Sequence, residues 1–355
     1  MKETADSIKT ENAILAEEIS KLKPFETFLD EKHVQVTYSL YLTMVDGKVI
    51  NALTGTSSQR CYICQCKPTE MNNLKNIKSF AIDEQNFQYG LSPLHARIKF
   101  LECILHISYK LDLQATTTRG ASNAQKERIQ ERKQQIQKKL WHELGLRVDK
   151  VVQGGGTSNT GNVARRFFEN PKEVAEITGV DENLIARFQT ILAILTSGYE
   201  LDHNKFDKFA TETAELFIRK YGWYRMPVTV HKILIHGSQA IKHMLLPIGM
   251  LSEEAQEACN KIYKRFREHH THLQRKSSRI NTTRDLLHML LVASDPVISR
   301  LRSSSKIHQR KLPNNALELI KFETDVKENK PSADDPEEEE DESEEEIEEE
   351  ELNFF

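Results

Sequence analysis

The sequence contains few cysteines and no long apolar stretch. Its five cysteines are an odd and sparse set for 355 residues, which argues against a disulfide framework and suits a reducing compartment. No run of about 18 apolar residues occurs, so we expect no membrane span. The N-terminal Met-Lys-Glu-Thr-Ala-Asp also lacks the apolar core of a signal peptide. These absences argue against a membrane protein and against a small disulfide-rich secreted protein.

Basic residues are also missing from one end of the chain. Residues 334–351 contain 15 Asp and Glu and no Lys or Arg. The remainder carries 49 Lys and Arg against 38 Asp and Glu, a formal charge of +11, although the whole protein has −4. A basic body is typical of proteins that bind nucleic acid, and an ordinary solvated surface is the alternative. Beyond about Lys321 we expect disorder, because a run of like charge repels itself and buries nothing.

Strand signals are few, and helical periodicity dominates. The alternating run over 34–45 predicts a strand, Asp46-Gly47 a turn, and residues 48–53 a returning strand. Gly222 and Gly237 are expected helix ends. Helices are predicted over 5–22 (polar), 94–112 (from its apolar periodicity), 123–143 (strongly charged), 183–198, 204–220, 228–236, 239–246, 252–274 and 283–293. The sequence therefore predicts a mostly α protein with a small β portion.

Two widely separated motifs together supply four metal ligands. Cys61 and Cys64 form a CxxC, and His231 and His236 form an HxxxxH that begins 167 residues after Cys64. Two thiolates and two imidazoles make a complete tetrahedral zinc set, and both internal spacings occur in structural zinc sites. A self-contained finger would close within about 12–15 residues. If these ligands meet, the metal joins two distant parts of one domain.

One predicted helix carries charge of both signs. Glu257, Lys261 and Lys264 lie within about 60° of one another on its exposed stripe. An ordinary ion pair between Glu257 and Lys261, worth a few tenths of a kcal/mol, is one interpretation. The other is a carboxylate that meets a metal ion at a phosphate group, with the neighbouring cations on the flanking phosphates.

A glycine-rich loop over 154–161 precedes Arg165 and Arg166. Backbone N–H groups at such a helix start can hold a phosphate, and plain loop flexibility is the alternative. No Gly-Lys-Ser/Thr follows, which excludes a Walker loop. The two tryptophans, Trp141 and Trp223, are expected in the core, with base stacking as the alternative for Trp223.

These motifs occur in an order that resembles a known family. Tyr62-Ile-Cys, Leu94-His95, Gly161-Asn-Val-Ala-Arg-Arg, the His231 to His236 motif and Glu257-Ala-Cys-Asn-Lys follow one another within residues 40–302. No single motif is specific, but their combination resembles the catalytic core of the V(D)J recombinase large subunit and of the Transib transposases.

The resemblance implies a fold and a chemistry. It implies a partial RNase H-like core, in which an Asp-Asp-Glu triad binds two Mg²⁺ or Mn²⁺ ions for in-line displacement at phosphorus. It also implies a large helical insertion that one zinc ion ties together through the CxxC and the HxxxxH. The implied domains are an N-terminal helix with remnant strands (1–60), a transposase-like core (61–302), and a basic linker with a disordered acidic tail (303–355).

The resemblance also places part of the triad. Glu257 matches the catalytic glutamate of the family. Arg97 occupies the position of the second aspartate, where a cation would repel the metal ions. We therefore expect a transposase-derived protein that has lost strand cleavage, so that Mg²⁺ or Mn²⁺ binds only if catalysis survives.

The partners follow from the same resemblance. It implies a nuclear protein that binds double-stranded DNA, and it implies a homodimer because paired DNA ends need two active sites. The expected DNA contacts are Arg165, Arg166, Lys261, Lys264, Arg265, Arg267, Arg275, Lys276 and Arg279.

Two alternatives to this interpretation stay open. The first is a working transposase or endonuclease with a rearranged triad, drawing replacement carboxylates from Asp46, Asp83, Glu84 and Glu102. The second is an interaction protein whose acidic tail binds histones or another basic partner, or folds back over the basic body.

Overall fold

A computed structural model describes most of the first 321 residues. The contacts within the chain separate residues 1–321 from residues 322–355, and the predicted acidic tail in the second unit lies outside the described residues. The predicted domain boundaries at residues 60 and 302 stay predictions. Side chains of 253–259, 279–282 and 293–294 are also outside the description. The described residues are 4–43, 45–77, 79–114, 121–152, 156–251, 253–269, 279–295, 297 and 312–321.

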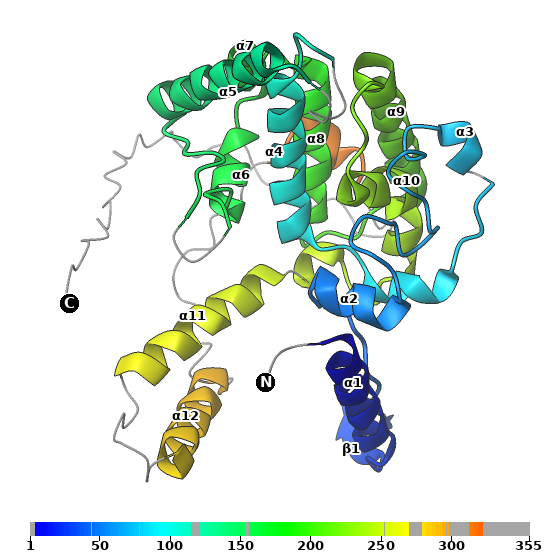
Figure 1. Ribbon diagram of the computed structural model, residues 1–355. Coiled ribbons are helices and arrows are strands. Elements are labelled where there is room, and N and C mark those ends of the chain that lie inside the picture. The colour runs from blue at the N-terminus through cyan, green and yellow to red at the C-terminus, as the bar shows by residue number, and fades with distance from the viewer. Residues whose placement is uncertain are drawn as a thin grey trace, which may run out of the picture. The chain divides into compact units, whose positions relative to one another are not determined.

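Helices dominate the described chain, as predicted (Figure 1). The sheet found there has two strands only, which confirms a mostly α protein with a small β portion. None of the described helices is long and apolar enough to cross a membrane. The helices are α1 (Ala5–Ser20), α2 (Gly47–Thr54), α3 (Leu74–Ile77), α4 (Pro93–Tyr109), α5 (Asn123–Leu144), α6 (Gly161–Phe167), α7 (Pro171–Thr178), α8 (Glu182–Leu195), α9 (His203–Tyr221), α10 (Val228–His243), α11 (Glu253–His269), α12 (Arg279–Ser294) and α14 (Asn314–Leu317), with short 3₁₀ helices η1 (Glu84–Tyr89) and η2 (Ile248–Leu251).

The N-terminal strands differ from the prediction. β1 (Phe25–Leu29) and β2 (Lys32–Val36) form an antiparallel hairpin, so β2 covers only the start of the predicted strand over 34–45. The segment expected to return as a strand forms α2 instead. The Asp46 side chain accepts a hydrogen bond from the Lys48 backbone N–H and caps that helix. The Asp-Gly pair therefore marks a helix start rather than a hairpin turn.

Helix α4 lies at the centre of the helical core. It contacts α5, α6, α7, α8, α10 and α11. Its N-terminus is set by Ser92, whose hydroxyl accepts from the His95 backbone N–H, and by Pro93 in the first turn. Phe100 and most apolar residues that follow it in α4 are fully buried, and the Phe100 ring lies 4.5 Å from that of Phe188. A helix that is apolar on nearly all sides has to be surrounded, which α4 is.

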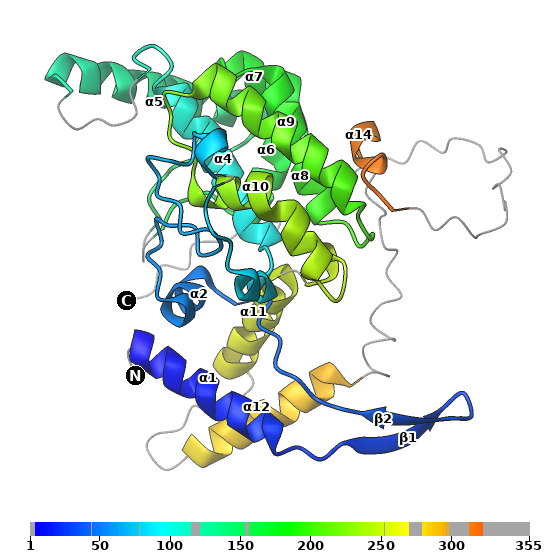
Figure 2. The ribbon, with the colours of Figure 1, turned by 90° about the vertical axis from the view of Figure 1, so that its right-hand side faces the viewer.

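Helices α9 and α10 form an antiparallel pair, seen side by side in Figure 2. Helix α9 ends before Gly222, as predicted, but the predicted end at Gly237 is wrong, because α10 continues through it. A Cβ atom on Gly237 would lie 2.8 Å from Cε1 of Phe206 on α9. The glycine therefore allows close packing of two helices and does not end one.

Candidate metal centre

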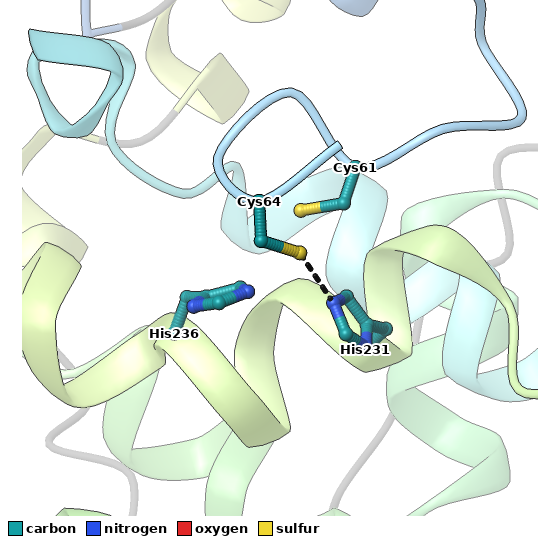
Figure 3. A group of neighbouring side chains, drawn as sticks. All are labelled: Cys61, Cys64, His231 and His236. Atoms are coloured by element: carbon teal, nitrogen blue, oxygen red, sulfur yellow. Dashed lines mark hydrogen bonds between the residues drawn. The ribbon is translucent and has the colours of Figure 1, made fainter. Parts of the chain in front are cut away.

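The four predicted metal ligands meet in the structure. Cys61 and Cys64 lie on the loop that follows α2, and His231 and His236 project from α10 (Figure 3). Their ligand atoms all lie within 4.8 Å of one another, and all four residues are buried. The Cys64 Sγ atom is 3.4 Å from Nε2 of His231. A group able to hold a metal ion is thus formed across 167 residues of sequence.

A tight turn brings the two cysteines to the same side of their loop. The Gln65 backbone N–H donates to the Cys61 carbonyl at 2.8 Å, and the Cys61 N–H donates to the Cys66 carbonyl at 3.2 Å. Gln65 takes a left-handed conformation, with φ of 57°. Both sulfur atoms consequently point toward α10 (Figure 3).

Helix α10 supplies the two imidazoles from positions five residues apart. At about 100° per residue, His231 and His236 lie about 140° apart around the helix axis, so their side chains reach the site from either side. The ring centroids are 5.2 Å apart with an interplanar angle of 74°. Buried Ile233 and Leu234 between them hold the helix against the core.

The electrostatics favour a thiolate at Cys61 and a neutral imidazole at His231, the forms that bind metals. Burial alone would raise the pKa of Cys61, but the neighbouring Cys64 thiol and the two imidazoles outweigh it and hold that pKa well below its usual range. The hydrogen bond to Cys61, followed by burial, raises the pKa of Cys64. Burial lowers the pKa of His231. A divalent cation among these atoms would remove the remaining thiol proton, since coordinated thiols ionise.

Unpartnered imidazole nitrogens indicate that the site suits a cation. Nδ1 of His231 and both ring nitrogens of His236 are buried and have no hydrogen-bond partner within the described part of the chain. Leaving a buried polar group unpaired costs about 1–3 kcal/mol. In a tetrahedral zinc site neighbouring ligand atoms are about 3.3–3.8 Å apart, and here all four ligand atoms lie within 4.8 Å of one another. The donor set and its spacing therefore fit a tetrahedral metal ion.

A second tie between the two ligand-bearing segments was not predicted from the sequence. The Asn72 side-chain amide donates to the carbonyls of Gly222 (2.9 Å) and Tyr224 (2.8 Å). Its oxygen accepts from the Met226 backbone N–H at 2.9 Å. These contacts fix the segment after the CxxC to the connection between α9 and α10. No pattern near Asn72 signals them, because its partners are backbone groups about 150 residues away.

The expected catalytic positions lie on two helices that contact each other, α4 and α11. Arg97 is on α4 and is only 7% exposed. Glu257 is on α11, but its side chain lies outside the described residues. The loss of the triad through Arg97 therefore stays a prediction.

None of the four candidate replacement carboxylates belongs to a metal-binding group in the described part of the chain. Asp46 caps α2, and Asp83 accepts from the Gln85 backbone N–H at 3.2 Å and so caps η1. Glu102 pairs with Lys99 at 2.7 Å, and Glu84 is exposed. Among the described residues, the Cys61 to His236 group is the only cluster of three or more His, Cys, Asp and Glu that could hold a metal ion.

The expected DNA-contacting cations are divided between α6, α11 and positions outside the description. Arg165 pairs with Glu169 at 3.1 Å, and Arg166 donates to the Leu144 carbonyl at 3.0 Å. On α11 the exposed cations are Lys261, Lys264, Arg265 and Arg267. Arg275 and Lys276, the side chain of Arg279 and residues 154 and 155 of the glycine loop lie outside the described residues.

One of the predicted core tryptophans is at the surface. Trp223 is partly buried against the core, as predicted, but Trp141 is 45% exposed. The prediction for Trp141 is wrong because α5 buries only a narrow face, formed by Ile136, Gln137 and Leu140.

The fold and the metal centre together define a mostly helical protein with a Cys₂His₂ group that spans distant segments. No protein-family model matches the sequence, and no curated protein sequence matches it. A function has to be inferred from the residues themselves.

Proposed function

We propose that the protein is a transposase-derived DNA-binding protein with a partial RNase H-like core and a large helical insertion that one structural zinc ion ties together. The observation that carries this proposal is the meeting of the CxxC and the HxxxxH in one buried group across 167 residues. The resemblance to the V(D)J recombinase and Transib cores implies ligand pairs this far apart in the sequence, whereas the pairs of a self-contained finger are about 12–15 residues apart.

Zinc is the ion that best suits the donor set. Two thiolates and two imidazoles favour Zn²⁺ over Mg²⁺ and Ca²⁺, which prefer oxygen ligands. Four protein ligands complete a tetrahedral shell and leave no position for water or substrate, so the role of the ion is structural.

Double-stranded DNA is the partner that the basic surface suits. Helix α11 exposes Lys261, Lys264 and Arg265, and the chain without residues 334–351 carries +11. Cations that neutralise phosphates release counterions, so the affinity for DNA should fall as salt rises. A nuclear protein that acts as a homodimer on paired DNA ends is consistent with this partner.

Loss of cleavage is part of the proposal. Two-metal catalysis needs carboxylates around both ions, and Arg97 would put a positive charge where the second aspartate belongs. Glu257 would be the one triad member retained, and without its partners it would not assemble a pair of Mg²⁺ or Mn²⁺ ions.

Zinc content, duplex binding and nicking together test the proposal. We expect about one zinc per chain, salt-dependent binding to duplex DNA, and no nicking with Mg²⁺ or Mn²⁺. The double variant Lys261→Glu, Lys264→Glu should lose most duplex binding. The same charge change at exposed Lys172 and Lys208 is the matched control and should leave binding nearly unchanged. Metal-dependent nicking that Glu257→Gln abolishes would establish the active-enzyme alternative instead.

A further inference from the structure

The C-terminal end of α5 carries an aromatic side chain in an unusual setting. Trp141 is 45% exposed, although tryptophan is a residue that folding normally covers. The Arg147 guanidinium carbon lies 4.7 Å from the centre of its ring. A cation is therefore stacked on the indole, while nearly half of the residue's surface stays exposed.

The local sequence builds this arrangement. Helix α5 ends at Gly145, which has a left-handed φ of 62°. The Gly145 N–H donates to the Trp141 carbonyl at 3.0 Å, and the Leu146 N–H donates to the Leu140 carbonyl at 2.9 Å. Leu146 is then buried against the core. This helix ending turns the chain back on itself, so that Arg147 returns over the ring of Trp141.

Three further cations lie along the C-terminal part of α5. Lys138 lies one helical turn before Trp141 and is exposed. Lys150 Nζ donates to the side-chain oxygen of Gln137 at 3.3 Å, which holds its charge beside the same turn of α5. Arg166 of α6 donates to the Leu144 carbonyl at 3.0 Å. Glu143, the acid closest to Trp141 in the sequence, projects about 160° away from it around the helix.

We propose that Trp141 and Arg147, with Lys138, Lys150 and Arg166, form a platform for single-stranded nucleic acid. An unpaired base would stack on the exposed part of the Trp141 ring, and the cations along this end of α5 would contact the adjacent phosphates. The stacked guanidinium holds the indole ring in place and adds cation–π attraction. A duplex cannot use this platform, because its bases are already stacked on one another.

This inference rests on the proposed nucleic-acid function but concerns a different ligand and a surface that shares only Arg166 with the expected duplex contacts. Helix α11 is proposed to contact duplex phosphates, which need only charge. The Trp141 platform combines charge with an exposed ring, and the ring has a use only where bases are unstacked. The two surfaces can therefore be tested separately in the same full-length protein.

Tryptophan fluorescence provides a direct test, because the chain has two tryptophans. The variant Trp223→Phe leaves Trp141 as the only tryptophan. We expect saturable quenching when this full-length variant is titrated with oligothymidylate of about 12 nucleotides, and no quenching with a duplex of equal length. Absence of quenching by the single strand would overturn the proposal.

Substitutions then separate stacking from charge. Trp141→Leu should weaken oligothymidylate binding about tenfold, as expected for the loss of one stacked base, and leave the salt dependence unchanged. Lys138→Ala should instead reduce the slope of log K against log salt by about 0.7, the value for one phosphate of a single strand. Trp223→Leu is the matched control and should bind like the wild type. Wild-type affinity in Trp141→Leu would overturn the proposal.

The failure of this inference is distinguishable from the failure of the proposed function. In Lys261→Glu, Lys264→Glu, duplex binding should fall while the quenching of Trp141 by oligothymidylate persists. Duplex binding without oligothymidylate binding would contradict the platform proposal and leave the proposed function standing. Absence of binding to either nucleic acid would contradict both proposals.

Discussion

The metal centre and the Trp141 platform differ in where their geometry comes from. At the metal centre, ligands from segments 167 residues apart are brought together by tertiary contacts, and three buried imidazole nitrogens have no partner among the described residues. At the platform, one helix ending folds back on itself, and its backbone groups are capped by Arg166 and by local hydrogen bonds. The first region should therefore depend on an ion for its stability, whereas the second should tolerate changes to its side chains.

Removal of the metal should have the largest effect on stability. An ion that binds only the folded state stabilises it by about 4 kcal/mol when its free concentration is about a thousand times its dissociation constant. We expect the double variant Cys61→Ser, Cys64→Ser, and chelator treatment of the wild type, each to lower the free energy of unfolding by about this amount. Thermal and denaturant unfolding with and without chelator measure it.

A matched control for the metal prediction is Cys103→Ser. Cys103 is buried on α4 and does not belong to the metal group. This variant should lose some stability from burying a hydroxyl, but its response to chelator should equal that of the wild type. A chelator effect of equal size in the protein without Cys61 and Cys64 would contradict the assignment of the ligands.

The loss of Asn72 should have the next largest effect. Asn72→Ala removes three hydrogen bonds to the connection between α9 and α10, which at about 1 kcal/mol each should cost about 2–3 kcal/mol with zinc present. Asn73→Ala is the control, because Asn73 is exposed and accepts a local hydrogen bond from the Asn76 backbone N–H. Equal unfolding free energies for the two variants would mean that the metal alone joins the segments.

The contrast between the metal ligands and Asn72 shows what the sequence can predict. Cys61, Cys64, His231 and His236 were predictable because soft ligands at these spacings have few other uses. Asn72 was not, because an asparagine that bonds to backbone groups leaves no pattern at its partners. The triad stays a prediction because the side chain of Glu257 lies outside the described residues, and the RNase H-like core stays one because the sheet found among them has only two strands.

The errors in the predicted fold have similar physical causes. The strand predicted over 48–53 is a helix because a single side-chain cap at Asp46 outweighed the β-branched composition. The end predicted at Gly237 is a packing position, which only the opposite Phe206 reveals. Trp141 was assigned to the core by residue type, and its exposure follows from which face of α5 meets the core.

Acidification by one pH unit should destabilise the metal centre by less than removal of the metal or of the Asn72 side chain. Burial lowers the pKa of His231 from its ordinary 6.5, so the folded state keeps this imidazole neutral where the unfolded chain would bind a proton. Stability from this group is therefore present above about pH 6.5 and is lost as the pH falls below it. Protons also compete with the ion, at up to about 1.4 kcal/mol per pH unit for each proton released on binding.

Melting temperatures between about pH 8 and pH 5 test this dependence. The wild type with zinc should lose stability more steeply than Cys61→Ser, Cys64→Ser, in which no ion competes with protons. Parallel pH profiles for the two proteins would argue against a metal that depends on these thiolates. Oligothymidylate binding at the Trp141 platform involves none of these groups and should change little where the protein stays folded.

The smallest expected effect on stability is at the platform itself. Trp141 and Arg147 are exposed, and the hydrogen bonds that end α5 are made by backbone groups and by Arg166. Trp141→Leu and Arg147→Ala should each change the free energy of unfolding by less than about 0.5 kcal/mol, the usual range for surface substitutions. Both variants should also keep the full zinc content, as measured by metal analysis after gel filtration.

A loss of unfolding free energy above about 1 kcal/mol in Trp141→Leu would place Trp141 among the residues that hold the fold together. The position of the side chain would then be explained by its contribution to folding stability, and no ligand would be needed to explain its exposure.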